Sequence, residues 1–486
     1  MNAPSSSQAA SSASAEARAT TVVAGLVESA RTAQAEFEKF DQNAVDQVVL
    51  AAGWAIMEPD RNRALAELAV SDTGLGDVDD KIAKNHRKTL GLLRDLAGAK
   101  SVGVISHDEQ TGVTEIARPV GVVAAITPST NPGATPANKI INALKGRNAV
   151  ILAPSPKGWT TARLLLDYVH AELERGGMSA TMARSLVQVL PQPVTKAATH
   201  ELMRQADLIV ATGSQSNIRA AYSSGTPAFG VGAGNVSVIV DASADVKTAA
   251  EAIAKSKTFD HATSCSSENS VVILDAVYDE TVAALEAAGG VMLNDAEKEQ
   301  LQGAMWPAGK LSGAMTAQSA TVIAMRAGLD HHAEKAGFLM VAEEGFGPAH
   351  PFSGEKLSPV LAVYRAADMQ DAMRIVSQIY DYQGAGHSVG LHARDAEALA
   401  HDLANQLPVS RVIVNQAHCI ATGGSFDNGL PFSLSMGCGT WGGNSFSSNM
   451  NYTHYLNITR IARPIAPVEP SVDDVFATYF EQVGRG

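Results

Sequence analysis

Short apolar segments rich in β-branched residues alternate with helical segments along most of the chain, and this alternation limits the possible folds. In the first half the apolar segments are Val120–Ile126, Ala149–Leu152, Leu186–Leu190, Asp207–Ala211 and Val236–Val240. Apolar runs separated by helices are typical of a parallel sheet covered by helices on both faces. A second alternating set extends from about Thr248 to Val414. The sequence therefore predicts an α/β fold of two lobes with a cleft between them.

The two ends of the chain set the predicted domain boundaries. Residues 1–20 are rich in Ser and Ala and are predicted to be a disordered tail. Apolar residues at helical spacing from Val23 to Phe40 open the first domain, which we place at residues 21–240 and interpret as helical and cofactor-binding. Residues 241–430 form the predicted catalytic domain. Residues 431–486 return to the cofactor domain and include an exposed strand within Asn451–Ile465, the candidate arm for oligomerisation.

Composition excludes several classes of protein. The 486 residues are 45% hydrophobic, and 37 basic against 50 acidic residues give a net charge of −13, which disfavours nucleic acid as a partner. No segment has the roughly 20 apolar residues of a membrane-spanning helix, and no signal pattern begins the chain, so a cytoplasmic protein is predicted. The three cysteines Cys265, Cys419 and Cys438 form no C-x-x-C pair, which indicates neither a disulfide framework nor a metal site.

Gly386-His387-Ser388-Val389-Gly390 matches the G-x-S-x-G pattern of serine hydrolases, and Asp427 and His454 follow in the order of a catalytic triad. That pattern requires a strand before the first glycine and a helix after the serine. Here residues 383–386 are predicted to be a loop and residues 388–392 a strand, which is the reverse order. A serine hydrolase is therefore the distant alternative.

Cys265 is a candidate nucleophile. It lies in the polar segment Thr263-Ser264-Cys265-Ser266-Ser267, just before the apolar strand Ser270–Leu274. The thiolate is the nucleophilic form of cysteine, and the backbone N–H groups of such a loop are suited to stabilise it. The alternative is a small buried hydrophobe, the usual role of a lone cysteine. The residues alone leave the two interpretations equal.

Two glycine-rich turns are candidates for binding a dinucleotide. Thr212-Gly213-Ser214 lies between a predicted strand and a predicted helix, where backbone N–H groups can bind a pyrophosphate. Gly230–Asn235, which contains Gly232, is the second. Neither has the G-x-G-x-x-G fingerprint, so each alone is a weak signal that a tight turn also explains.

Five segments together resemble the CoA-acylating aldehyde dehydrogenases: Thr127–Pro132, Ala211–Gly213, Ala220–Gly225, Ser264–Ser270 around Cys265, and Gly437–Ser445. The resemblance covers nearly all of the chain from about residue 20. Within the family the sequence is most similar to the acylating sulfoacetaldehyde dehydrogenases. The resemblance implies an aldehyde dehydrogenase-like fold, with a Rossmann-like cofactor lobe, a catalytic lobe and a β-arm that builds a homodimer or homotetramer.

The resemblance also implies roles for individual residues. Cys265 is the nucleophile, and Asn131 with the backbone N–H of Cys265 holds the oxyanion. Glu355 matches the glutamate that binds the nicotinamide ribose, with a solvated surface glutamate as its alternative. His387 assists acyl transfer or is structural, and these two interpretations are equal. The remaining cofactor-binding candidates are Thr127, Pro128, Ser155, Lys157, Gly213, Ser214 and Gly232.

Two further features bear on the substrates. Hydrolytic relatives carry a water-activating glutamate where this chain has Gly230–Asn235, so coenzyme A rather than water is the implied acyl acceptor. Ser155 and Lys157 follow a predicted strand with no carboxylate nearby in sequence, which favours NADP, or both NADP and NAD. The expected reaction converts sulfoacetaldehyde to its acyl-CoA, or the reverse. Acetaldehyde, propionaldehyde and succinate semialdehyde are the alternative substrates, and a non-catalytic scaffold would not need Cys265, Asn131 and Glu355 together.

Overall fold

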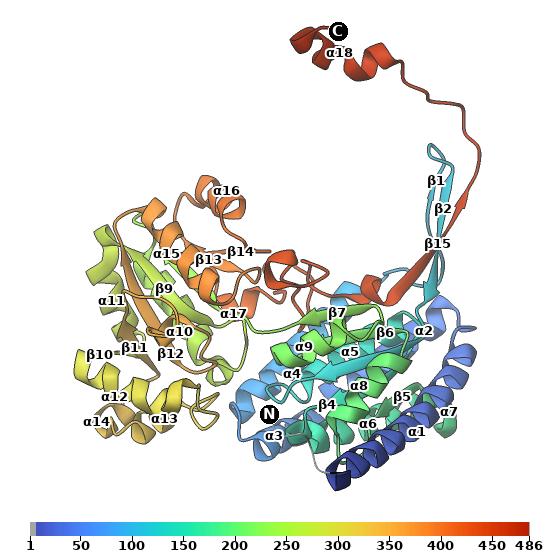
Figure 1. Cartoon of the computed structure of the whole chain (residues 1–486), viewed down its shortest axis with the longest axis horizontal. Coiled ribbons are helices and arrows are strands. Elements are labelled where there is room, and N and C mark those ends of the chain that lie inside the picture. Colours follow the sequence, from blue (N-terminus) through green and yellow to red (C-terminus); the bar gives the residue numbers. More distant parts are fainter. Residues whose placement is uncertain (1–5, 486) are drawn as a thin grey trace.

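Two parallel sheets form the centres of two lobes (Figure 1). The computed structural model describes residues 6–485. The first sheet has five strands in the order β5-β4-β3-β6-β7, and the second has seven in the order β10-β11-β12-β9-β8-β13-β14. All neighbouring strands in these two sheets run parallel. The predicted α/β fold is confirmed.

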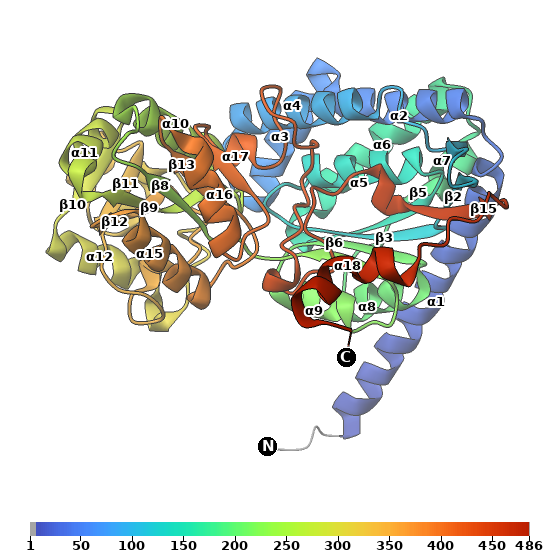
Figure 2. The same ribbon diagram turned by 90° about the horizontal axis from the view of Figure 1, so that it is seen from above.

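Helices cover both faces of the first sheet: α5 and α6 lie on one side, and α1, α8 and α9 on the other (Figure 2). The strands are β3 (Val122–Thr127), β4 (Ala149–Pro154), β5 (Val187–Val189), β6 (Leu208–Thr212) and β7 (Ala228–Val231). The helices are α1 (Ser6–Phe37), α2 (Gln42–Met57), α3 (Pro59–Thr73), α4 (Val78–Leu96), α5 (Ala134–Lys145), α6 (Trp159–Arg175), α7 (Ala180–Leu186), α8 (Lys196–Gln205) and α9 (Gln215–Tyr222). Every residue of β3 and β4 is buried, as expected for strands covered on both faces.

Helix α1 begins earlier than the sequence analysis predicts. Residues 6–20, expected to be disordered, belong to α1, whereas residues 1–5 of the predicted tail lie outside the described residues. Further along α1, Val23, Ala30 and Phe37 are fully buried in the core of the first lobe. A helix anchored in this way can extend into adjacent Ala-rich sequence, because propagation needs no new nucleus.

The second sheet consists of β8 (Val236–Val240), β9 (Glu268–Leu274), β10 (Gly290–Leu293), β11 (Phe338–Ala342), β12 (Val360–Ala366), β13 (Val389–His392) and β14 (Val412–Val414). Its helices are α10 (Val246–Thr258), α11 (Tyr278–Ala287), α12 (Asp295–Met305), α13 (Ala320–Arg326), α14 (Asp330–Ala333), α15 (Met369–Tyr382), α16 (Ala396–Gln406) and α17 (His418–Ala421). The predicted boundary at residue 240 differs from the structure, since β8 pairs with β9 and β13 of the second lobe. A fully buried apolar strand carries no sequence signal for the sheet it joins. The chain passes between the sheets within Gly232–Asn235.

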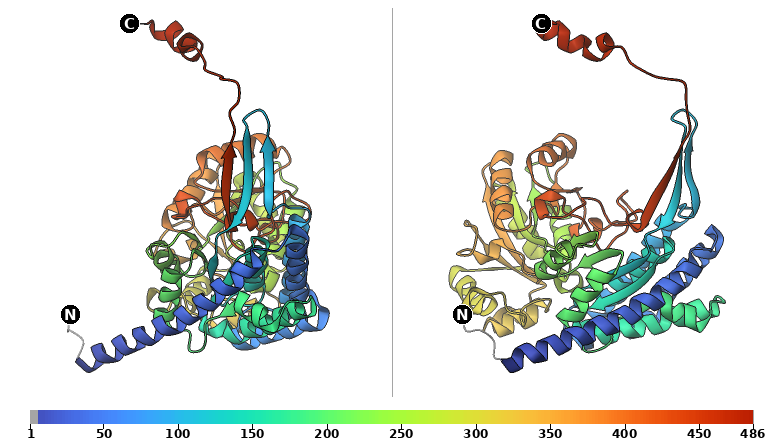
Figure 3. Two further views of the ribbon diagram at one scale, coloured as in Figure 1. Left: turned by 90° about the vertical axis from the view of Figure 1, so that its right-hand side faces the viewer. Right: turned by 45° about the vertical axis from the view of Figure 1, so that its right-hand side comes forward.

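A third, antiparallel sheet stands out from the first lobe (Figure 3). It contains β1 (Gly103–Asp108), β2 (Val113–Pro119) and β15 (Leu456–Ala462), the strand predicted near the C-terminus. Strand β15 pairs with β2 from Leu456 opposite Pro119 to Ala462 opposite Val113. Helix α18 (Val472–Val483) follows and lies away from both lobes (Figures 1 and 3). Within residues 6–485, no helix is both long enough and apolar enough to cross a bilayer.

Candidate active site

A cavity of about 390 Å³ lies at the carboxyl ends of the first sheet. Thr127 ends β3, Ser155 follows β4, and Gly213 follows β6; all three line the cavity. Strand β3 has β4 on one side and β6 on the other, so the strand order reverses direction here. Ligands of open α/β sheets bind at such a point. Cys265 and Glu355 of the second lobe line the same cavity.

Nine of the eleven predicted site residues line this cavity. His387 is buried and contacts Cys265. Lys157 is exposed in the short helix η1 (Pro156–Gly158) and does not line the cavity. The nine are Thr127, Pro128, Asn131, Ser155, Gly213, Ser214, Gly232, Cys265 and Glu355.

The thiol of Cys265 contacts a chain of hydrogen-bonded side chains. Its Sγ lies 3.5 Å from Nε2 of His387. Nδ1 of His387 lies 2.7 Å from Oγ of Ser388, which lies 2.8 Å from Nε2 of His418. If Nδ1 of His387 carries the proton and donates it to Ser388, Nε2 is free to accept the thiol proton. The arrangement suits a neutral imidazole acting as a base toward Cys265.

Burial keeps both members of the pair neutral at pH 7. It raises the pKa of the Cys265 thiol to about 12, and the neighbouring Glu355 and Cys438 act in the same direction. Burial also lowers the pKa of His387 to about 3, and the nearby Arg411 adds to this effect. The sequence predicts that the N–H groups of the loop around Cys265 stabilise a thiolate. The backbone N–H of Cys265 does act in that direction, but desolvation of the sulfur outweighs it.

Asn131 is held by a buried lysine. Nζ of Lys84 donates to Oδ1 of Asn131 at 2.9 Å and to Oγ1 of Thr263 at 3.1 Å. A lysine can donate only to the oxygen of the amide, so Nδ2 of Asn131 is the end left to donate elsewhere. Helix α4, which carries Lys84, thereby orients the predicted oxyanion donor.

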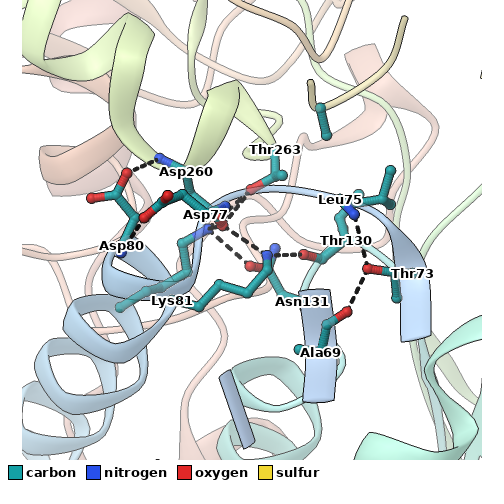
Figure 4. A network of polar contacts seen from close by, with 12 residues as sticks. Ala69, Thr73, Leu75, Asp77, Asp80, Lys81, Thr130, Asn131, Asp260 and Thr263 are labelled. Atoms are coloured by element: carbon teal, nitrogen blue, oxygen red, sulfur yellow. Dashed lines mark hydrogen bonds and ion pairs between the residues drawn. The ribbon is translucent and has the colours of Figure 1, made fainter. Parts of the chain in front are cut away.

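One carboxylate joins this helix to the loop before the cysteine. Asp260 is fully buried and forms an ion pair with Lys84. A second ion pair, at 3.1 Å, joins it to Lys81 (Figure 4). Nζ of Lys81 also donates to the backbone carbonyl of Thr130 at 3.1 Å, next to Asn131 (Figure 4). Despite burial, the two ammonium groups and the hydroxyl of Thr263 hold the pKa of Asp260 below its usual value. The cluster thus links the segments that carry Asn131 and Cys265.

The backbone before the cysteine is strained. Asp260, His261 and Ala262 have φ values of 51°, 49° and 55°, in the left-handed region that non-glycine residues rarely adopt. Each such residue costs on the order of 1–3 kcal/mol and persists where surrounding contacts fix it. At Asp260 the contacts are the two lysines, the N–H of Asp77 donating to Oδ1 at 2.9 Å, and its own N–H donating to Asp80 at 2.7 Å.

Glu355 lies across the cavity and accepts a hydrogen bond from the N–H of Gly234 at 3.0 Å. Burial raises its pKa to about 8. Gly234 also packs against the nucleophile, since a Cβ there would lie 2.5 Å from the carbonyl oxygen of Cys265 and 3.0 Å from the ring of His387. No larger side chain fits at this position.

The serine hydrolase alternative is wrong. Ser388 is fully buried between two imidazoles and directly precedes β13, so no strand–turn–helix exposes its hydroxyl.

Sequence reasoning also missed Lys84 and Asp260. Lys81, Lys84 and Lys88 are three and four residues apart in α4, which places them on one helical face. That spacing was the available signal, but a row of lysines usually indicates a solvated face.

The family model described as "Aldehyde dehydrogenase family" matches residues 2–433. This chain belongs to the aldehyde dehydrogenase family. It is 63% identical over 464 residues to a protein of Cupriavidus necator named sulfoacetaldehyde dehydrogenase (acylating), covering 95% of this chain and 93% of that protein. A Bilophila wadsworthia protein of the same name is 42% identical, covering 95% and 99%. An acetylating aldehyde dehydrogenase structure from Geobacillus thermoglucosidasius superposes with a TM-score of 0.89 at 35% identity, covering 94% of this chain and 99% of that one.

We expect the alkylation of Cys265 by iodoacetamide to accelerate about tenfold per pH unit between pH 7 and 9. The raised thiol pKa, about 12, leaves the reactive thiolate a small fraction that grows tenfold with each unit. Mass spectrometry of the Cys265 peptide measures the rate, and the Cys265→Ser variant corrects for the other two cysteines. A rate independent of pH over this range would indicate a preformed thiolate–imidazolium pair and contradict the neutral pair.

We expect Asp260→Asn to lower the free energy of unfolding by about 3–5 kcal/mol, because it leaves two buried ammonium groups without a carboxylate. Denaturant titration measures the change. Asp167→Asn is the matched control, since Asp167 pairs with Arg163 on the surface of α6 and its loss should have little effect. Equal stability of the two variants would show that the Asp260 cluster does not stabilise the fold.

Proposed function

We propose that this protein is a CoA-acylating aldehyde dehydrogenase that converts sulfoacetaldehyde to sulfoacetyl-CoA with NADP or NAD, or catalyses the reverse reduction. The observation that carries the proposal is the contact between Cys265 and His387. Cys265 lines the cavity that lies where the strand order of the first sheet reverses, at β3. The two relatives named acylating sulfoacetaldehyde dehydrogenase support the acyl acceptor and the substrate.

In the first half-reaction, Nε2 of His387 accepts the thiol proton as the sulfur of Cys265 bonds to the aldehyde carbon. The carbonyl oxygen becomes an oxyanion, and donors fixed beforehand stabilise it most effectively. Nδ2 of Asn131, oriented by Lys84, and the backbone N–H of Cys265 are the proposed donors. Ser388 and His418 hold the orientation of the imidazole while it carries the extra proton.

The residues at the carboxyl ends of β3 and β6 fit a nicotinamide dinucleotide. Oγ1 of Thr127 is buried and has no hydrogen-bond partner among the described residues, so it is available to a ligand. A Cβ at Gly213 would meet only Nδ2 of Asn217, at 3.9 Å, and Ser214 is the N-cap residue of α9, where backbone N–H groups favour phosphate. We propose that Glu355, which lines the same cavity, accepts a hydrogen bond from a ribose hydroxyl. A bound nicotinamide supplies the hydride acceptor that turns the adduct on Cys265 into a thioester.

We propose NADP as the preferred cofactor, with NAD as a second. Ser155 lines the cavity after β4, and Lys157 lies exposed two residues further on. Neither has a carboxylate neighbour within Ala153–Lys157, and a basic side chain beside the adenine ribose accommodates a 2′-phosphate.

Residues 230–235 carry no glutamate that could activate water, so we propose that the second half-reaction uses CoA. The thioester on Cys265 persists until the thiol of CoA attacks it, and the Cys265 thiolate leaves. Once His387 has released the first proton to solvent, it can accept the proton of the CoA thiol and pass it to the departing Cys265 thiolate. We also propose that the sheet of β1, β2 and β15 joins subunits, because its two outer strands present free edges to a second copy.

A panel of aldehydes, each assayed with and without CoA, tests the proposed reaction. We expect the highest kcat/KM for sulfoacetaldehyde, compared with acetaldehyde, propionaldehyde and succinate semialdehyde. Without CoA, cofactor reduction should stop after about one turnover per site, because the thioester accumulates. A higher kcat/KM for another aldehyde contradicts the substrate. Sustained acid formation without CoA contradicts the acceptor and would point to Glu355 as a base for water.

The nucleophile has its own test. We expect Cys265→Ser to reduce kcat by at least about 1,000-fold while cofactor binding and thermal stability persist, since the hydroxyl is a far weaker nucleophile of similar size. Cys438→Ser is the matched control, because Cys438 is buried close to the site and its thiol is not needed for the chemistry. Equal loss of activity in both variants would mean that packing, not nucleophilic attack, explains the effect.

A further inference from the structure

Helix α4 brings more positive charge to the active site than the neighbouring carboxylates neutralise. Lys81, Lys84 and Lys88 lie along one face of the helix, with Arg87 beside them. Lys81 and Lys84 pair with Asp260. Neither Arg87 nor Lys88 forms an ion pair with any residue of the described chain.

Lys88 is the clearest case. It is 6% exposed, and its Nζ donates to the backbone carbonyl of Gly423 at 2.6 Å. An ammonium group has three N–H donors, and besides the face of the Phe432 ring, 5.5 Å away, the described residues supply no second acceptor for it. Burial, with Arg87 nearby, lowers its pKa well below the usual value of a lysine. Burying a charge without a counter-ion is costly, so a partner of opposite charge would stabilise Lys88 strongly.

Arg87 has a similar environment. Its two terminal nitrogens donate only to backbone carbonyls, at 3.1 Å to Ile420 and at 3.4 Å to Gly424. The second distance is long for a hydrogen bond. Arg87 and Lys88 therefore both retain capacity to bind an acceptor with several oxygens.

These cations line a small cavity beside the nucleophile. It measures about 20 Å³, against about 390 Å³ for the cofactor cavity, so it fits a group of a few atoms and excludes a nucleotide. Its lining includes Lys84, Arg87, Lys88, Asn131, Ser264 and Ser266. Asn131 and Ser264 line both cavities, and the two serines flank Cys265 in sequence.

The two serines offer a further donor. Their hydroxyl oxygens lie 2.7 Å apart, so one O–H group is used between them and the other stays free to donate. Burial alone does not make a lysine part of an anion subsite. Lys139 is also buried and donates only to a backbone carbonyl, that of Val210 at 2.9 Å, but it lines neither of these two cavities.

We propose that Lys88 and Arg87, with the hydroxyls of Ser264 and Ser266, form a subsite that binds the anionic group of the aldehyde, a sulfonate. This inference rests on the proposed function and names the part of the site that selects its substrate. In sulfoacetaldehyde one methylene separates the sulfonate from the aldehyde carbon. The anion must therefore bind close to Cys265, and both sequence neighbours of Cys265, Ser264 and Ser266, line this cavity. Lys88 has two unused N–H groups, and Arg87 and the serine pair add further donors, so the three sulfonate oxygens can all be satisfied.

Substitution of Lys88 tests the subsite. We expect Lys88→Met to lower kcat/KM for sulfoacetaldehyde about 100-fold, as for loss of a hydrogen bond to a charged group, and to change kcat/KM for propionaldehyde less than threefold. Lys88→Arg should restore most of the activity on sulfoacetaldehyde. Lys139→Met, the matched control for loss of a buried lysine, should affect the two aldehydes equally. An equal decrease for both aldehydes in Lys88→Met would make Lys88 a clamp for the Gly423 loop and overturn the subsite.

A binding experiment separates this inference from the proposed function. We expect ethanesulfonate to slow alkylation of Cys265 by iodoacetamide in the wild type but not in Lys88→Met, whereas dimethyl sulfone, which is uncharged, protects neither. Propionate tests whether a carboxylate binds in the same way. Protection by ethanesulfonate supports the anion subsite even if sulfoacetaldehyde is a poor substrate. No protection in the wild type overturns the subsite, even if sulfoacetaldehyde is turned over.

Discussion

The buried ion cluster of Asp260 with Lys81 and Lys84 is the interaction on which the geometry of the site depends. It connects helix α4 of the first lobe with the strained turn that leads to Cys265 in the second lobe. Ion pairs in water contribute little, but removing one partner of a buried pair leaves an uncompensated charge. The cluster therefore resists separation of the two segments. The same Lys84 fixes the amide of Asn131, so one group of charges positions both the proposed nucleophile and the proposed oxyanion donor.

Desolvation is the second constraint, and it acts on four ionisable groups around the thiol. It raises the pKa of Cys265 and Glu355 and lowers that of His387 and Lys88. The neutral form is favoured in each case, because a medium of low polarity stabilises charge poorly. The charged form of such a group becomes favourable only when a bound substrate brings a group of opposite charge beside it. In our proposal the Asn131 amide donates to an oxyanion, and Lys88 binds a sulfonate.

Close backbone packing supports this chemistry. The segment that crosses between the sheets places Gly234 against the carbonyl of Cys265 and the ring of His387. Gly386 has φ of 91°, and a Cβ there would lie 2.0 Å from the carbonyl oxygen of Cys438. Gly234 lets the crossing segment contact Cys265 and His387. Gly386, next to His387, lets that loop pack against Cys438. Any side chain at Gly234 or Gly386 would force these segments apart.

The sequence by itself determined the class of fold, because alternating buried strands and helices can pack only as parallel sheets covered on both faces. It also determined the candidate residues at strand ends, such as Thr127 and Gly213, since the carboxyl ends of parallel strands share one edge. Only the tertiary structure decided that β8 belongs to the second sheet and that Ser388 is buried between two imidazoles. Only the tertiary structure brought Lys84 and Lys88 close to the loop that carries Cys265. These contacts join residues far apart in the chain, and their effects on pKa arise from burial, a property of the packed molecule that no local pattern of residues encodes.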